Sequence, residues 1–117
     1  MHELSIIESV VSTVTEAMAA CREARIVSVR LKVGALSGVD ESALEFCYAI
    51  AADGTMLAGS RLIVMRQPVV IYCRPCGELR ELAGVQSFRC PVCGVPCGDI
   101  RQGRELEVES VEIEEAA

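Results

Sequence analysis

Four of the chain's seven cysteines form two C-x-x-C pairs, each followed by a glycine. The pairs are Cys73-Arg-Pro-Cys76 and Cys90-Pro-Val-Cys93, and thirteen residues separate them. A two-residue spacer lets both thiolates of a pair face one tetrahedral ion, with Zn–S distances of about 2.3 Å. The glycines suit a backbone that turns tightly beside the sulfurs. The spacing therefore predicts a structural zinc site built from these four cysteines.

Other chemistries compete for the same thiols. An iron–sulfur cluster and a redox-active dithiol use similar pairs. A secreted disulfide scaffold is disfavoured, because the cysteine count is odd and no secretion signal is visible. A closed four-cysteine site leaves no coordination position for a substrate, so its expected role is to fold a segment. Cys97 is expected to be a spectator, since a fifth thiolate would overfill a tetrahedral ion, although a role as competing ligand stays open.

A second candidate metal site lies at the start of the chain. His2 is the sole histidine, and a lone histidine is more often an ordinary surface or core residue. A bulky second residue, however, disfavours removal of Met1, so the free amine is expected beside the imidazole. The Met1 amine, the His2 amide nitrogen and the His2 ring can chelate one ion. Such a nitrogen-rich planar site suits Ni(II) or Cu(II) rather than zinc.

Charge is distributed unevenly over the 117 residues, whose formal net charge is −6. Residues 66–104 carry six arginines against three acidic residues, whereas the remainder holds five basic and fourteen acidic residues. Because the net charge is negative, most of the protein's surface is expected to repel nucleic acid. Its apolar runs are shorter than the roughly 20 residues of a membrane helix. A cytoplasmic location without membrane insertion is expected.

The hydrophobic pattern predicts two helices. Apolar residues recur every three or four positions from Leu4 to Cys21, so an amphipathic helix with Cys21 on its core face is expected. A second helix is expected from Asp40 or Glu41 to Asp53, with Asp40 as its N-cap. Cys47 lies on the apolar stripe of this second helix and is expected to be an inert core thiol.

Three segments are expected to form strands. Val27, Val29, Leu31 and Val33 alternate with Ser28, Arg30 and Lys32, which predicts a strand with the polar residues on its exposed face. Arg61–Met65 and Leu106–Ile113 are the other two. The predicted fold is α+β: two helices packed on a small three-stranded sheet, with an inserted four-cysteine module. The predicted domains are 1–67 with 105–117, and the zinc-binding module 68–104.

Several stretches together resemble one known family. They are the opening Met1-His2-Glu3-Leu4-Ser5-Ile6, the turn Val33-Gly34-Ala35-Leu36-Ser37-Gly38-Val39, Leu44-Glu45-Phe46, the paired cysteine motifs, and Val108-Glu109-Ser110-Val111-Glu112-Ile113. In this order they resemble the HypA/HybF hydrogenase nickel-incorporation proteins over essentially the whole chain. The Met-His-Glu start joined to a four-cysteine module is specific to that family.

The resemblance implies a cytoplasmic nickel metallochaperone that serves [NiFe]-hydrogenase maturation. It implies two partners, a HypB-like nickel-handling GTPase and the hydrogenase large subunit, and it leaves a homodimer open. It places transported Ni²⁺ at Met1 and His2, with Glu3 in partner docking or site tuning and Asp40 near the nickel. It also places structural Zn²⁺ on the four paired cysteines. Several relatives carry histidines beside the cysteine pairs, where this chain has Tyr72, Gly77, Arg89 and Gly94.

Two rival functions follow from the residues alone. A zinc-ribbon module that binds nucleic acid or protein would use the arginines around the cysteines. The absence of tryptophan, and the presence of only Tyr72 and Phe88 as nearby aromatics, disfavour nucleic acid as its ligand. An enzyme is also disfavoured, since no Ser/His/Asp set remains once His2 binds metal.

Overall fold

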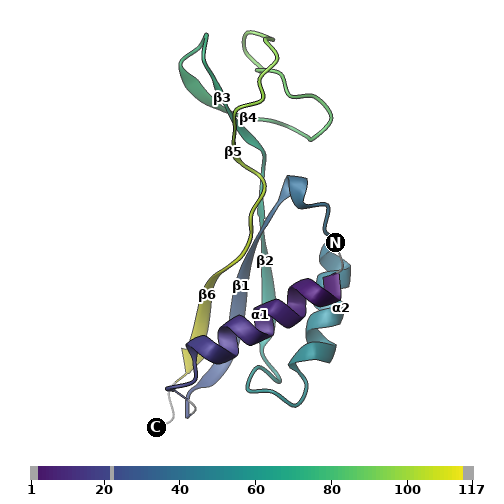
Figure 1. Ribbon diagram of the computed structural model, residues 1–117, viewed down its shortest axis with the longest axis vertical. Helices are drawn as coiled ribbons and strands as arrows, with labels where there is room; N and C mark the ends of the chain where they lie inside the picture. The colour runs from purple at the N-terminus through teal and green to yellow at the C-terminus, as the bar shows by residue number, and fades with distance from the viewer. Residues whose placement is uncertain (1–2, 22, 115–117) are drawn as a thin grey trace. The chain divides into compact units, whose positions relative to one another are not determined.

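A computed structural model describes residues 3–21 and 23–114 as an α+β protein (Figure 1). The two helices are α1 (Glu3–Ala17) and α2 (Glu41–Ala52). A short 3₁₀ helix, η1 (Ala35–Ser37), separates α2 from the first strand. The strands are β1 (Arg25–Gly34), β2 (Arg61–Gln67), β3 (Val70–Cys73), β4 (Glu78–Glu81), β5 (Ile100–Gln102) and β6 (Leu106–Glu114). None of the described helices is long and apolar enough to cross a bilayer.

The chain divides into two compact units. The first contains the residues up to Leu31, Val39–Met65 and the residues from Glu107 onward; the second contains Lys32–Gly38 and Arg66–Leu106. Strands β1, β2 and β6 each contribute residues to both units. Residues 32–38 thus belong to the unit that holds the cysteine pairs, although we expected them in the other domain. The domain assignment itself stays a prediction.

The first unit places two mutually packed helices with the sheet of order β2-β1-β6. Helix α1 buries Ile6, Ile7, Val10 and Val14, which recur at helical spacing. The Asp40 side chain caps α2 by accepting a hydrogen bond from the Ser42 amide at 3.0 Å. Both helices and the three-stranded sheet are therefore confirmed.

Two expectations about this unit are wrong. Helix α1 ends at Ala17, because the chain tightens into turns closed by hydrogen bonds from Ala19 to Glu16 and from Cys21 to Met18. Cys21 consequently lies outside the helix and is exposed rather than buried in a core. Ser28 is buried, not exposed, because its hydroxyl donates to the Glu112 carboxylate at 3.1 Å. Cys47 is half-buried.

The second unit contains a sheet of order β4-β3-β5 that the sequence did not predict. β3 and β4 form an antiparallel hairpin in which Cys73 pairs with Glu78 and Ile71 with Arg80. A small core of Val69, Ile71 and Leu82 packs with half-buried apolar residues, namely Leu36, Phe88, Cys97 and Ile100. This module therefore has a modest apolar core of its own beside the cysteines.

Gly34 allows two backbone segments of the second unit to come close together. The Gly34 amide donates to the Glu105 carbonyl at 2.7 Å, and the Leu36 amide donates to the Gly103 carbonyl at 2.8 Å. A Cβ at position 34 would overlap the Gly103 carbonyl and lie 2.6 Å from the Arg104 nitrogen. The φ of Gly34 is −73°, an ordinary value, so the requirement for glycine is one of space.

Replacing Gly34 should therefore lower stability through overlap of the new Cβ with backbone. We expect Gly34→Ala to reduce the free energy of unfolding by about 2 kcal/mol or more, since backbone cannot yield as a side chain can. Thermal and urea unfolding measure this. Gly84→Ala is the matched control, because a Cβ there meets no atom within 4 Å. Equal stability of the two variants would contradict the steric account.

Candidate metal centre

The first cysteine pair lies in the loop of the β3–β4 hairpin. Cys73 is the last residue of β3, and the loop returns to β4 through a hydrogen bond from the Gly77 amide to the Cys73 carbonyl at 2.8 Å. Gly77 has a φ of 67°, in the left-handed region, while a Cβ there would meet no atom within 4 Å. The loop therefore requires glycine for its backbone conformation rather than for space.

The second pair lies in a loop of matching construction. The Gly94 amide donates to the Cys90 carbonyl at 2.8 Å, and Gly94 has a φ of 76°. Two further backbone bonds close the base of this loop, from Cys90 to Val95 at 3.0 Å and from Cys97 to Phe88 at 2.8 Å. Each C-x-x-C-G segment thus directs both of its thiols to one side of a tight turn.

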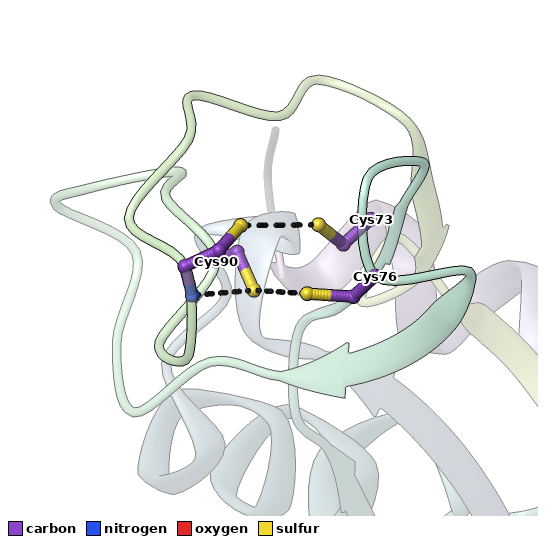
Figure 2. Close-up of side chains that lie close together, drawn as sticks. Cys73, Cys76 and Cys90 are labelled. Carbon is purple, nitrogen blue, oxygen red and sulfur yellow. Dashed lines mark hydrogen bonds between the residues drawn. The ribbon is translucent and has the colours of Figure 1, made fainter.

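The two loops bring the four thiols together, and Figure 2 shows Cys73 and Cys76 directed at the loop that carries Cys90. All four Sγ atoms lie within 4.8 Å of one another. The Cys73–Cys93 and Cys76–Cys90 sulfur distances are 3.5 and 3.9 Å. Tetrahedral zinc with Zn–S bonds of about 2.3 Å separates its sulfurs by about 3.8 Å, whereas a disulfide needs about 2.05 Å. The donor set fits zinc in both chemistry and spacing.

Hydrogen bonding distinguishes the thiols within this cluster. Hydrogen bonding from the Cys93 backbone amide lowers the pKa of Cys90 to about 6. The Val92 amide adds to this effect, whereas burial opposes it. The Cys76 amide lowers the pKa of Cys73, but burial and the three neighbouring thiols together raise it to about 12. The four crowded thiols therefore differ in how readily they release a proton. A bound divalent cation would take the place of these protons.

Cys97 lies outside this group of four. Its thiol donates to the Tyr72 carbonyl at 2.7 Å, and its side chain packs against the small core of the second unit. Among residues 3–21 and 23–114, the four paired cysteines are the one group of three or more candidate metal ligands. Cys97 therefore has a structural environment that explains it without metal.

Arg80 is a residue of this site that the sequence did not single out. It lies on β4 opposite Ile71, two positions along the hairpin from the Cys73–Glu78 pair. Because cross-strand partners and alternate residues share a face, Arg80 is on the same face as Cys73. The alternation of side chains along a strand could have identified Arg80, but that alternation can be used only once the register of the hairpin is known.

At the other end of the sequence, the structure brings Glu3 and Asp40 together. The Glu3 carboxylate accepts a hydrogen bond from the Asp40 amide at 3.3 Å, joining the start of α1 to the N-cap of α2. Asp40 thus presents its side chain to the Ser42 amide and its own amide to Glu3. Met1 and His2 lie outside the described residues, so their expected nickel role stays a prediction.

Known proteins match this chain over nearly its whole length. The family model described as hydrogenase/urease nickel incorporation, metallochaperone, HypA matches residues 1–113. A hydrogenase maturation factor HypA from Chloroflexus aurantiacus is 47% identical over 112 residues, which are 96% of this chain and 98% of that protein. The corresponding factor from a Roseiflexus species is 43% identical over 115 residues, 98% of this chain and 94% of its own.

Solved structures agree with the fold. The solution structure of the Ni metallochaperone HypA from Helicobacter pylori superposes with a TM-score of 0.68 at 20% identity. It covers 99% of this chain, and this chain covers all of it. A second solution structure, titled HypA protein, gives a TM-score of 0.71 at 21% identity over 97% of each chain. At such identities the likeness establishes the fold.

Two substitutions separate the capping oxygen of Asp40 from its negative charge. Asp40→Ala removes the oxygen that caps α2, so we expect a loss of about 1 kcal/mol in the free energy of unfolding. Asp40→Asn keeps an acceptor for the Ser42 amide and should stay close to the native stability. Thermal unfolding of both variants measures the difference. A large loss in Asp40→Asn as well would mean that its charge, rather than its cap, stabilises the helix.

Proposed function

The chain belongs to the HypA family of hydrogenase/urease nickel-incorporation metallochaperones, and from that premise we propose how it handles its metals. It holds Ni(II) at its N-terminus as cargo and delivers it to [NiFe]-hydrogenase during maturation. A structural zinc ion bound by Cys73, Cys76, Cys90 and Cys93 holds the second unit together. Metallochaperones deliver metal rather than catalyse a reaction, so no catalytic residue is assigned.

The closed geometry of the four-thiol cluster is the observation that carries this proposal. Four sulfurs within 4.8 Å of one another supply every position of a tetrahedral ion, so cargo has no position to enter. Thiolates also suit zinc, whereas Ni(II) in a planar site suits nitrogen donors. Within the described residues no other group of three candidate ligands exists. The cargo site at the Met1-His2 start rests on the donor chemistry of these two residues and on the family resemblance.

The nickel ligands in this proposal are the Met1 amine, the His2 amide nitrogen and the His2 ring. Glu3 follows them directly in sequence, and its hydrogen bond to the Asp40 amide fixes the start of α1 against the α2 cap. Two carboxylates at this position favour a bound cation by charge. Glu3 and Asp40 therefore support the site, through position and electrostatics, with oxygen ligation as an additional role.

The partners follow from the same premise. We propose that a HypB-like nickel-handling GTPase and the hydrogenase large subunit receive this protein in the cytoplasm. The acidic first unit and the arginine-rich second unit give two electrostatically different surfaces for such partners. Electrostatic recognition of either would make association rates fall as salt concentration rises.

The rival function, a zinc ribbon for nucleic acid, loses support from the arginines themselves. Arg101 binds the Asp99 carboxylate with both Nε and a terminal nitrogen and stacks 4.9 Å from the centre of the Tyr72 ring. Arg89 donates to the Gly94 carbonyl at 3.2 Å. These cations have partners within the unit, so the basic segment offers fewer free charges to phosphate than its composition indicates.

Removal of a zinc ligand should unfold the second unit selectively. We expect Cys93→Ala to lose the stoichiometric zinc, the signals of residues 66–106 and solubility, while the helices of the first unit persist. Zinc analysis combined with amide NMR spectra measures this. Cys21→Ala is the control, because Cys21 is exposed and lies outside the cluster. A zinc-replete, natively folded Cys93→Ala protein would sink the ligand assignment.

Nickel binding should depend on the chain terminus as well as on His2. One extra residue before Met1 converts the amine into a peptide nitrogen, a far poorer donor unless it loses its proton. We expect this variant and His2→Ala to weaken nickel binding strongly or change its geometry, with zinc content unchanged. Nickel titration followed by absorption spectra measures both. An extended protein with unaltered affinity and spectrum would exclude the amine-anchored site and leave nickel to other donors.

A further inference from the structure

Arg80 is the one charged side chain of the second unit whose buried nitrogen is left without a hydrogen-bond partner. Its side chain is 24% exposed, yet its Nε is fully enclosed. The nearest carboxylate, Glu78, lies 3.9 Å from a terminal nitrogen, too far for a hydrogen bond. A buried guanidinium nitrogen without an acceptor is costly, so its position calls for an anionic neighbour.

That neighbour is the thiol cluster. β4 places Arg80 on the face that also carries Cys73, and the Cys76 thiol is the strongest influence on the guanidinium. Hydrogen bonding to Cys76, opposed by burial and reinforced by Cys90, raises the pKa of Arg80. The two sulfurs come from different cysteine pairs, and the buried Nε of Arg80 lies on the cluster's face of the hairpin with no partner of its own.

Charge balance gives this contact its significance. Four thiolates with one Zn²⁺ carry a net charge of −2, whereas the metal-free cluster is less negative, because thiols such as Cys73 keep their protons. A fixed positive charge beside the sulfurs therefore favours the zinc-bound state over the metal-free state. Arginine stays protonated at all physiological pH values, so this support does not vary with pH.

We propose that Arg80 is a positioning residue that stabilises the zinc–tetrathiolate cluster by donating its guanidinium N–H groups to the Cys76 and Cys90 sulfurs. It lowers the basicity and nucleophilicity of these thiolates and so slows loss of zinc. The inference rests on the zinc site proposed above and deepens it. It assigns retention of the metal to a residue that touches the ligands rather than the ion.

The test compares zinc affinity in Arg80→Met with affinity in the native protein, using competition with a chromogenic chelator on the full chain. We expect zinc binding to weaken about tenfold, the lower end of the range for residues that hydrogen-bond to ligands, and transfer to the chelator to accelerate. Arg74→Gln is the matched control. Arg74 is also in the first cysteine loop, but its exposed side chain interacts with Asp99.

A spectroscopic readout separates charge from packing. In protein loaded with Co(II), removal of a cation from the sulfurs raises the energy of their lone pairs. The sulfur-to-cobalt charge-transfer band of Arg80→Met should therefore move to longer wavelength. Arg80→Lys keeps the charge but loses the planar fork, and should fall between the native protein and Arg80→Met in band position and affinity.

Defined results would overturn the inference. Native zinc affinity and an unshifted band in Arg80→Met exclude a role for Arg80, and an equal loss in Arg74→Gln shows a general charge effect instead. Arg80→Lys as weak as Arg80→Met excludes the charge contribution. If Arg80→Met fails to fold, Arg80→Gln is judged by the same criteria. A native protein that binds no zinc would overturn the zinc site itself, which is distinguishable from all of these.

Discussion

Four thiolates held within 4.8 Å of one another repel strongly unless a cation lies among them, and the second unit is built around that constraint. Its apolar cluster beside the cysteines has just three buried members, Val69, Ile71 and Leu82. So small a core rarely stabilises an independent fold, which is why small modules use metals. In the proposed site, zinc–thiolate bonds would join two loops that no regular hydrogen-bond ladder connects directly. The proposed zinc site would therefore make metal binding and folding of this unit one equilibrium.

The backbone of each cysteine loop solves the same local problem. A thiolate pair must face one ion while the chain reverses, and a glycine in the left-handed region at Gly77 and Gly94 completes each reversal. The Gly77 and Gly94 amides donate hydrogen bonds to the Cys73 and Cys90 carbonyls, so each loop is closed by its own backbone rather than by side chains elsewhere. Because the geometry is local, residue spacing alone was sufficient to predict the cluster.

Features that depend on distant segments were not predictable in the same way. Strands β3, β4 and β5 are three or four residues long, too short for alternation to distinguish them from loop. Ser28 looked like an exposed strand residue, but it is buried, and Glu112, far along the chain, accepts the hydrogen bond from its hydroxyl. The early end of α1 follows from turn hydrogen bonds that a run of helix-favouring residues conceals. Arg80 needed the register of a hairpin before its neighbour could be known.

The two candidate metal sites differ in ways that suit their separate tasks. A structural ion should stay bound, and the proposed zinc site offers four soft donors, two of which, Cys73 and Cys90, are at most 2% exposed. Cargo must instead leave, so its ligands should be few, replaceable by water and near the surface. The proposed cargo site adjoins the start of α1, where the Glu3–Asp40 hydrogen bond is exposed and 3.3 Å long. Its donors in the proposal are a terminal amine, an amide and one imidazole, each able to exchange a metal bond for a proton. In this proposal a transfer partner competes for nickel ligand by ligand while zinc keeps its own four thiolates, so that one metal is released and the other retained.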